Sequence, residues 1–345
     1  MINLYGIKCL LFLIGIRFTK KDFNKDYLSK QTTTIINGFF VLTIVFSHFK
    51  NTVNLSPSFI DQSLVRILNN IGQLMVTTFF FYSGYGIMES IKNKDDYIKN
   101  FFKRRVFPLW LNLAMGVALF LLVFLIRGQF FTIKQILLGF IGYEPIGNCN
   151  WFIFDTLLLY ILTMICFNKK ALGNKEYIRQ TIVMLFLVLS VISTLCMFRP
   201  SRFVNTILCF PFGMLFCLYK PSVDEFFKKK YFIKFALVIL TFITLFIARR
   251  KFVIDNDLYY NLYSMSFVSC IVVASMKYTF NNKVFEFLGK HVFWIYVLQM
   301  IPLTCLKDVI ENKYILFISC LAITLISSYW MNRFSKWIFA PKKTK

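Results

Sequence analysis

Long apolar runs, separated by short polar and basic segments, cover almost the whole chain. A transmembrane helix needs about 20 mainly apolar residues, with a range of roughly 17–25. Runs of this length predict about ten transmembrane helices, and therefore an all-α, polytopic integral membrane protein. Their approximate bounds are 32–50, 69–90, 106–126, 150–167, 180–198, 203–219, 231–248, 259–276, 291–306 and 314–332.

Basic residues are distributed unevenly between the segments that join these helices. If the N-terminus is inside, the inner segments hold 27 Lys and Arg residues and the outer segments hold 11. Because positive charge accumulates on the cytoplasmic side, this asymmetry predicts that both termini are cytoplasmic and that 50–68 and 127–149 lie outside. Residues 1–31, with an apolar run at 4–16 too short to span, are expected to form a cytoplasmic or interfacial segment, and 333–345 a basic tail.

The composition supports a membrane protein and argues against other classes. Of 345 residues, 57% are apolar and 16% are charged, whereas a soluble domain has about 25% charged residues. The net charge of +24 would suggest nucleic acid in a soluble protein, but here the basic residues lie between apolar runs and face anionic lipid head groups. Membrane lipids are thus the expected partners, in the cell membrane, and nucleic acid is not. No metal-ligand cluster, HExxH, GxSxG or nucleotide loop occurs, so no metal is expected.

Two polar residues lie on one stripe of the first predicted helix. His48 follows Asn37 by eleven residues, which returns to nearly the same helix face about 16 Å further along the axis. The pair predicts a polar cavity or track, since an ionisable residue within a span is a functional candidate. Two alternatives stay open: Asn37 and Gly38 make a helix–helix contact, and His48 reaches the lipid head groups.

Further candidates carry charge. Asp155 lies about five residues into its helix, where its carboxylate could orient the His48 imidazole; an ion pair with a Lys or Arg is the alternative. Lys103, Arg104 and Arg105 are consecutive at the cytoplasmic surface and could hold phosphates, or could serve only to fix the topology. His291 is expected at a cytoplasmic helix start, where a solvated histidine has no special role.

Four stretches, in order along the chain, form a recognisable set. They are Ile36-Asn37-Gly38 with Ser47-His48-Phe49, Phe79 to Tyr85 with its Ser-Gly-Tyr end, Lys103-Arg104-Arg105 with Pro108, and Asn150-Trp151-Phe152-Ile153. With these stretches the chain resembles the membrane-bound acyltransferase 3 family, the OafA-like O-acyltransferases. The resemblance extends over about 32–332, which we take as one transmembrane domain.

The resemblance implies an O-acyltransferase, most often an O-acetyltransferase, that moves an acyl group from acetyl-CoA to a hydroxyl of a cell-surface polysaccharide. It implies that His48 is the functional histidine and that position 37, here Asn37, helps to hold the acyl-CoA donor. From their positions in the sequence we expect Asp155 to be the catalytic partner of His48, the Lys103–Arg105 cluster to hold the phosphates of the donor, and Trp151 to contact the glycan acceptor. The chain departs from the family twice. Asn37 stands where many members have arginine, and Gln299 stands where a histidine is common.

Two other functions are possible for a membrane protein with this composition. A transporter or flippase of a lipid-linked glycan would be expected to have more basic residues within its spans than Lys234 alone. A polymerase of such a glycan would be expected to have a large outer loop, and no predicted outer loop exceeds about 20 residues. Acyl transfer by the purified protein separates the enzyme from a transporter.

Overall fold

The computed structural model of the chain describes residues 1–20, 23–53, 59–147, 150–168, 173–195, 203–252 and 256–340. It consists of helices and one two-stranded antiparallel sheet, in which Arg17 pairs with Thr279. The elements of the first half are α1 (Ile2–Ile14), β1 (Ile16–Phe18), α2 (Lys30–Thr52), α3 (Phe59–Ile71), α4 (Met75–Asn93), the π-helix η1 (Phe102–Val106), α5 (Phe107–Ile126), α6 (Ile133–Phe140) and α7 (Trp151–Cys166). The elements of the second half are α8 (Asn174–Leu195), α9 (Cys209–Lys228), α10 (Tyr231–Lys251), α11 (Asp257–Ser275), β2 (Tyr278–Phe280), α12 (Lys283–Lys290), α13 (Val292–Leu298), α14 (Met300–Leu306) and α15 (Lys313–Ile338).

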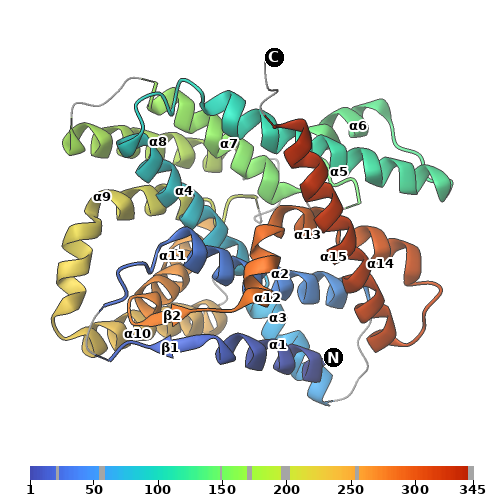
Figure 1. Cartoon of the computed structure of the whole chain (residues 1–345), viewed down its shortest axis with the longest axis horizontal. Helices are drawn as coiled ribbons and strands as arrows, with labels where there is room; N and C mark the ends of the chain where they lie inside the picture. Colours follow the sequence, from blue (N-terminus) through green and yellow to red (C-terminus); the bar gives the residue numbers. More distant parts are fainter. Residues whose placement is uncertain are drawn as a thin grey trace.

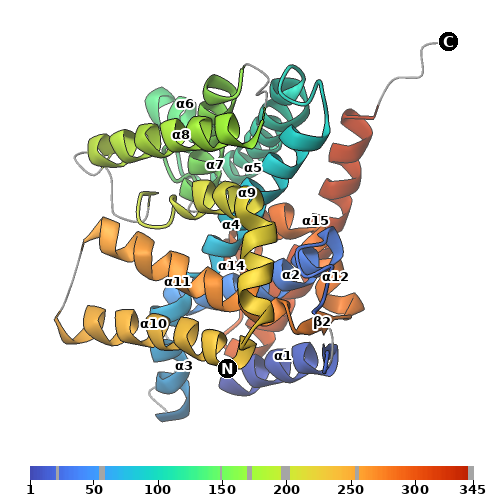
Figure 2. The same cartoon turned by 90° about the vertical axis from the view of Figure 1, so that its left-hand side faces the viewer.

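The prediction of an all-α, polytopic membrane protein is confirmed. Among the described residues, seven helices are long and apolar enough to cross a membrane, and α12 with α13–α14, bent by 67°, makes an eighth if counted as one span. The two other predicted spans correspond to α7, which has 16 residues, and to α9, which carries Lys220, Asp224 and Glu225 in its second half. Helix α10 has only Tyr231 buried and packs on α11 at the edge of the molecule (Figure 2).

Reciprocal glycine contacts bring two pairs of helices unusually close. A Cβ on Gly84 would lie 2.0 Å from the Phe210 carbonyl oxygen, and one on Gly213 would lie 2.1 Å from that of Phe81, so α4 and α9 touch through their backbones. In the same way α2 meets α12 at Gly38, where a Cβ would lie 1.9 Å from a carbonyl oxygen. Small residues allow such contacts between membrane helices, and the helix–helix contact that stood as the alternative interpretation of this stretch is present at Gly38.

Helix α1 lies antiparallel along α2. The Tyr5 ring contacts Phe46, and the Phe12 ring contacts Phe39, with centroid distances of 5.4 and 4.4 Å. Between these pairs the ammonium of Lys8, only 3% exposed, donates to the Thr43 hydroxyl. Helix α1 is thus packed against α2 along its length, although Lys8 is its one buried residue.

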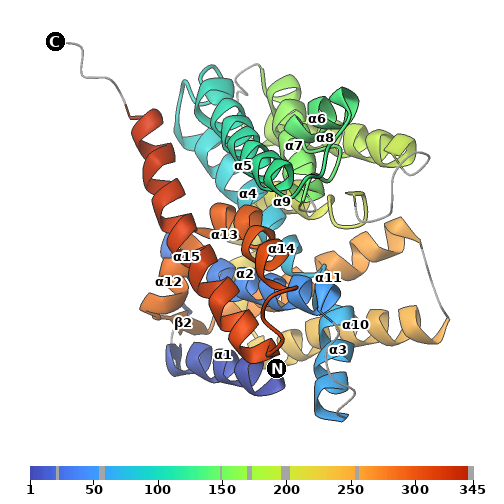
Figure 3. The ribbon, with the colours of Figure 1, turned by 90° about the vertical axis from the view of Figure 1, so that its right-hand side faces the viewer.

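Met1 and the last residues that the structure describes lie at opposite ends of α15. The Met1 ammonium forms an ion pair with Asp61 at 3.1 Å and donates to the Tyr314 hydroxyl at 2.7 Å, beside the first turn of α15. Helix α15 has 26 residues, about 39 Å, and leads to the C-terminus (Figure 3). The distribution of basic residues predicts that Met1 lies on the cytoplasmic side and Asp61 on the outer side. Because the two residues are in contact, these two predictions cannot both be right.

Candidate active site

Helix α2 carries the histidine of the candidate site. The helix begins at Lys30 because the Ser29 hydroxyl caps it, accepting a hydrogen bond from the Thr32 amide at 3.2 Å. His48 lies in its last turns and borders a cavity of about 180 Å³. The lining is largely polar or aromatic and comprises Ile44, Ser47, His48, Asn51, Gly72, Gln73, Val76, Trp151 and Tyr296.

Asn37, on the same stripe of α2, borders a second and larger cavity. This cavity has a volume of about 460 Å³. Its polar lining residues are Lys30, Thr33, Asn37, Tyr82, Ser83, Arg105, Thr156, Tyr160 and Tyr296. The Ser83 and Tyr160 hydroxyls lie 3.1 Å apart, and the Tyr82 hydroxyl is buried without a hydrogen-bond partner in the described part of the chain.

Tyr296 of α13 lines both cavities, so they adjoin at its side chain. Figure 1 shows α13 beside α2 near the centre of the molecule, and contacts between the two helices agree. The Tyr296 ring lies 6.2 Å from the His48 ring. A path of lining residues therefore leads from Lys30, at the start of α2, to His48 near its end.

Of the three consecutive basic residues Lys103, Arg104 and Arg105, only Arg105 lines the larger cavity. Arg105 lines the larger cavity, and its Nε donates to the Tyr97 hydroxyl at 3.1 Å. Lys103 and Arg104 are exposed and do not line that cavity. Successive residues of a helix point about 100° apart, so three in a row cannot all face one cavity. The Lys103–Arg105 cluster contributes one side chain to the site.

The structure does not join His48 to Asp155. The Asp155 side chain is 0% exposed, and both of its carboxylate oxygens are without a hydrogen-bond partner in the part of the chain that the structure describes. Asp155 is not among the residues lining the cavity of His48, although Trp151, one turn earlier on α7, is. Trp151 and Asp155 are the two residues of α7 that the sequence predicts at the site. Trp151 lines the cavity of His48, whereas Asp155 makes no hydrogen bond to His48.

Three further residues belong to the site. Lys30 and Tyr296 were not expected there: Lys30 supplies charge beside Asn37, and Tyr296 lines both cavities. Gln299, expected only as a departure from the family, shares with His48 a third, very small cavity. The signal for Gln299 was present, since it stands where the resembling family commonly has a histidine. The expectation that His291 is solvated is wrong: it is 8% exposed, and its Nδ1 lies 2.8 Å from the Phe287 carbonyl oxygen.

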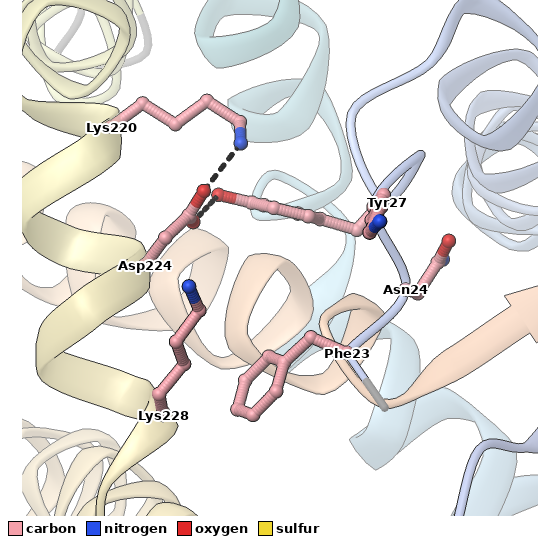
Figure 4. Close-up of a pocket in the computed structure, with 7 residues that line it drawn as sticks. Phe23, Asn24, Tyr27, Lys220, Asp224 and Lys228 are labelled. Carbon is pink, nitrogen blue, oxygen red and sulfur yellow. Dashed lines mark hydrogen bonds and ion pairs between the residues drawn. The ribbon is translucent and has the colours of Figure 1, made fainter. Parts of the chain in front are cut away.

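A further polar cavity, of about 450 Å³, shares no lining residue with this path, and Figure 4 shows the side chains that border it. It is bordered by the segment before α2 and by the end of α9. The Asp224 carboxylate accepts hydrogen bonds from the Tyr27 hydroxyl and the Lys220 ammonium, both at 2.6 Å. Burial is the largest cause of a raised pKa of the Tyr27 hydroxyl, and the hydrogen bond to Asp224 raises this pKa further. These bonds fasten the segment that leads into α2 and thereby help to fix the position of Lys30.

The site lies within a bundle of membrane helices, where a histidine borders one cavity and a basic, polar cavity adjoins it. A family model described as an acyltransferase domain matches residues 35–333. The chain therefore belongs to the acyltransferase 3 family of membrane acyltransferases. No curated protein and no solved structure matches the chain.

Proposed function

We propose that this acyltransferase is an O-acetyltransferase that moves an acetyl group from acetyl-CoA to a hydroxyl of a cell-surface polysaccharide in the cell membrane. The observation that supports this proposal most directly is the pair of cavities that adjoin at Tyr296. One is basic and large enough to receive part of a nucleotide-linked donor. The other holds the histidine and is bordered by an aromatic side chain.

The donor is proposed to enter the larger cavity. Arg105 and Lys30 line it, and both can make charge-assisted hydrogen bonds to phosphate. Asn37 lacks the charge that the family often has at this position, and these two side chains supply charge in the same cavity. The extended arm of acyl-CoA then follows the stripe of α2 toward Tyr296, so that its thioester approaches His48, about 16 Å from Asn37 along the helix.

The acceptor is proposed to bind in the smaller cavity. The Trp151 ring offers an apolar face for a sugar ring, and the neighbouring Ser47 and Asn51 offer polar contacts to its hydroxyls. His48 takes the proton from the attacking hydroxyl as its oxygen bonds to the thioester carbonyl carbon. The carbon–sulfur bond breaks, and the imidazolium returns the proton to the departing thiolate. A route through a transient acyl-His48 uses the same groups.

Two measurements test this function. The purified protein in detergent should release free CoA from acetyl-CoA only when envelope glycan is added, and it should transfer labelled acetyl to that glycan. A transporter or polymerase of the glycan would transfer none. In cells, the NMR spectrum of envelope glycan from a deletion strain should lack an acetyl resonance that the wild-type gene restores. An unchanged spectrum, together with no transfer in vitro, would contradict the proposal.

A further inference from the structure

Gln299 places a buried amide next to the candidate base. It follows α13 directly, where the chain passes into α14, and its side chain is 4% exposed. Its Nε2 donates to the Tyr296 carbonyl oxygen at 3.0 Å. Its Oε1 is buried and has no hydrogen-bond partner among the described residues. A buried acceptor left in this state is costly, so a role for it is expected.

A very small cavity connects Gln299 to His48. Both side chains border it, together with Thr324 of α15, and the remaining lining is apolar. Its volume of about 10 Å³ is close to the space that one water molecule needs. Such a water requires two to four polar partners, and the imidazole, the amide and the hydroxyl can provide three.

The His48 ring borders both this small cavity and the larger cavity proposed for the acceptor. The residue as a whole is partly exposed, whereas its Nδ1 is buried and has no hydrogen-bond partner in the described part of the chain. The exposed part of the ring therefore excludes Nδ1. Two unpartnered atoms, Nδ1 of His48 and Oε1 of Gln299, thus belong to side chains that share one cavity of water size.

We infer that Gln299 is a positioning residue that fixes the tautomer of His48 through one water molecule. The Nδ1–H of His48 donates to the water, and the water donates to the Gln299 Oε1. This arrangement leaves Nε2 of His48 without a proton and available to the acceptor hydroxyl. The hydrogen bond that Nδ1–H donates holds the proton on Nδ1 and thereby sets the state of Nε2. The inference rests on the proposed function of His48 as a base.

Gln299 thereby takes the task that the sequence analysis gave to Asp155. A base commonly needs a third group that holds it in the reactive orientation. Asp155 makes no hydrogen bond to His48, whereas Gln299 shares a cavity with it. Without an acceptor on the Nδ1 side, the ring can carry its proton on Nε2, the atom that has to accept one.

The tautomer can be observed directly because the chain has only two histidines. In the purified wild-type protein, labelled with ¹⁵N-histidine and reconstituted in lipid, NMR should report His48 protonated at Nδ1. In Gln299→Leu the proton should move to Nε2. Met300→Leu, a change of similar size in the same cavity that removes no acceptor, should leave the wild-type tautomer. The signal of His291 reports that each variant is folded.

Kinetics provide a second readout. Gln299→Leu should lower kcat roughly tenfold to a hundredfold, the range for losing a partner that orients a functional side chain, with the KM for acetyl-CoA unchanged. Gln299→Glu, which keeps an acceptor oxygen, should recover most of the rate. His48 protonated at Nε2 in the wild type, or an identical tautomer in Gln299→Leu, would overturn the inference while leaving acyl transfer intact. A wild-type protein with the expected tautomer but no transfer would instead contradict the proposed function.

Discussion

Replacing Arg105 tests how the acyl donor is held. If its guanidinium contacts a donor phosphate, Arg105→Gln removes a charge-assisted hydrogen bond. Such a bond contributes about 1.5–3 kcal/mol, and about 1.4 kcal/mol corresponds to a factor of ten in affinity. More than a third of the Arg105 surface is exposed, which lowers its contribution through solvent screening. The expected effect is therefore at the lower end, a rise of about tenfold in the KM for acetyl-CoA.

The assay is the initial rate of acetyl transfer by the purified protein as acetyl-CoA is varied. Two controls are available within the chain. Arg104→Gln removes the neighbouring charge, which does not line the cavity, and should leave KM unchanged. Tyr97→Phe removes the hydroxyl that accepts from Arg105 and reports how much of the effect comes from that bond. A KM within twofold of wild type for Arg105→Gln, or an equal rise for Arg104→Gln, would refute phosphate binding at this position.

Three further predictions concern the scaffold. Gly84→Ala should lower Tm, since its Cβ would lie 2.0 Å from a backbone oxygen of α9 and overpacking costs about 1–3 kcal/mol. Gly86→Ala, with no atom within 4 Å of its Cβ, should keep or raise Tm, and equal losses would refute backbone contact between these helices. Tyr27→Phe should destabilise the protein by about 1.5–3 kcal/mol through the lost bond to Asp224, and an unchanged denaturation midpoint would show that the bond contributes nothing. An Asn3→Cys probe in a cysteine-free background should react with an impermeant reagent from outside, because Met1 contacts Asp61 in a segment that the basic-residue count places there; labelling only after permeabilisation would instead support the cytoplasmic N-terminus that the sequence predicts.

Local patterns in the sequence were sufficient for the fold class and for the stripe on α2. Apolar length identifies most of the spans, and helical periodicity places Asn37 and His48 on one face. In the structure each of these residues borders one of two adjoining cavities. The contact at Gly38 also follows from local composition, because small residues mark helix interfaces in membranes.

Contacts between distant segments could not be read in this way. Gln299 borders the same small cavity as His48, and the segment that carries it is bent by 67° from α12, an arrangement that no local pattern specifies. The direction of Asp155 depends on the rotation of α7 within the bundle, and the sequence fixes depth along a helix better than rotation about it. The position of α1 similarly depends on ring contacts with α2, while its short apolar run indicates only an affinity for the membrane.

The central claim is that His48 carries out acetyl transfer to an envelope glycan. Its most direct test is the acetyl content of that glycan, measured by NMR, in a deletion strain that expresses either wild-type protein or His48→Ala at equal membrane levels. Loss of a positioned base typically lowers a rate by about 10²–10⁴, so the acetyl resonance should return with the wild type and stay undetectable with His48→Ala. Near-normal acetylation by His48→Ala would contradict the mechanism proposed for this site.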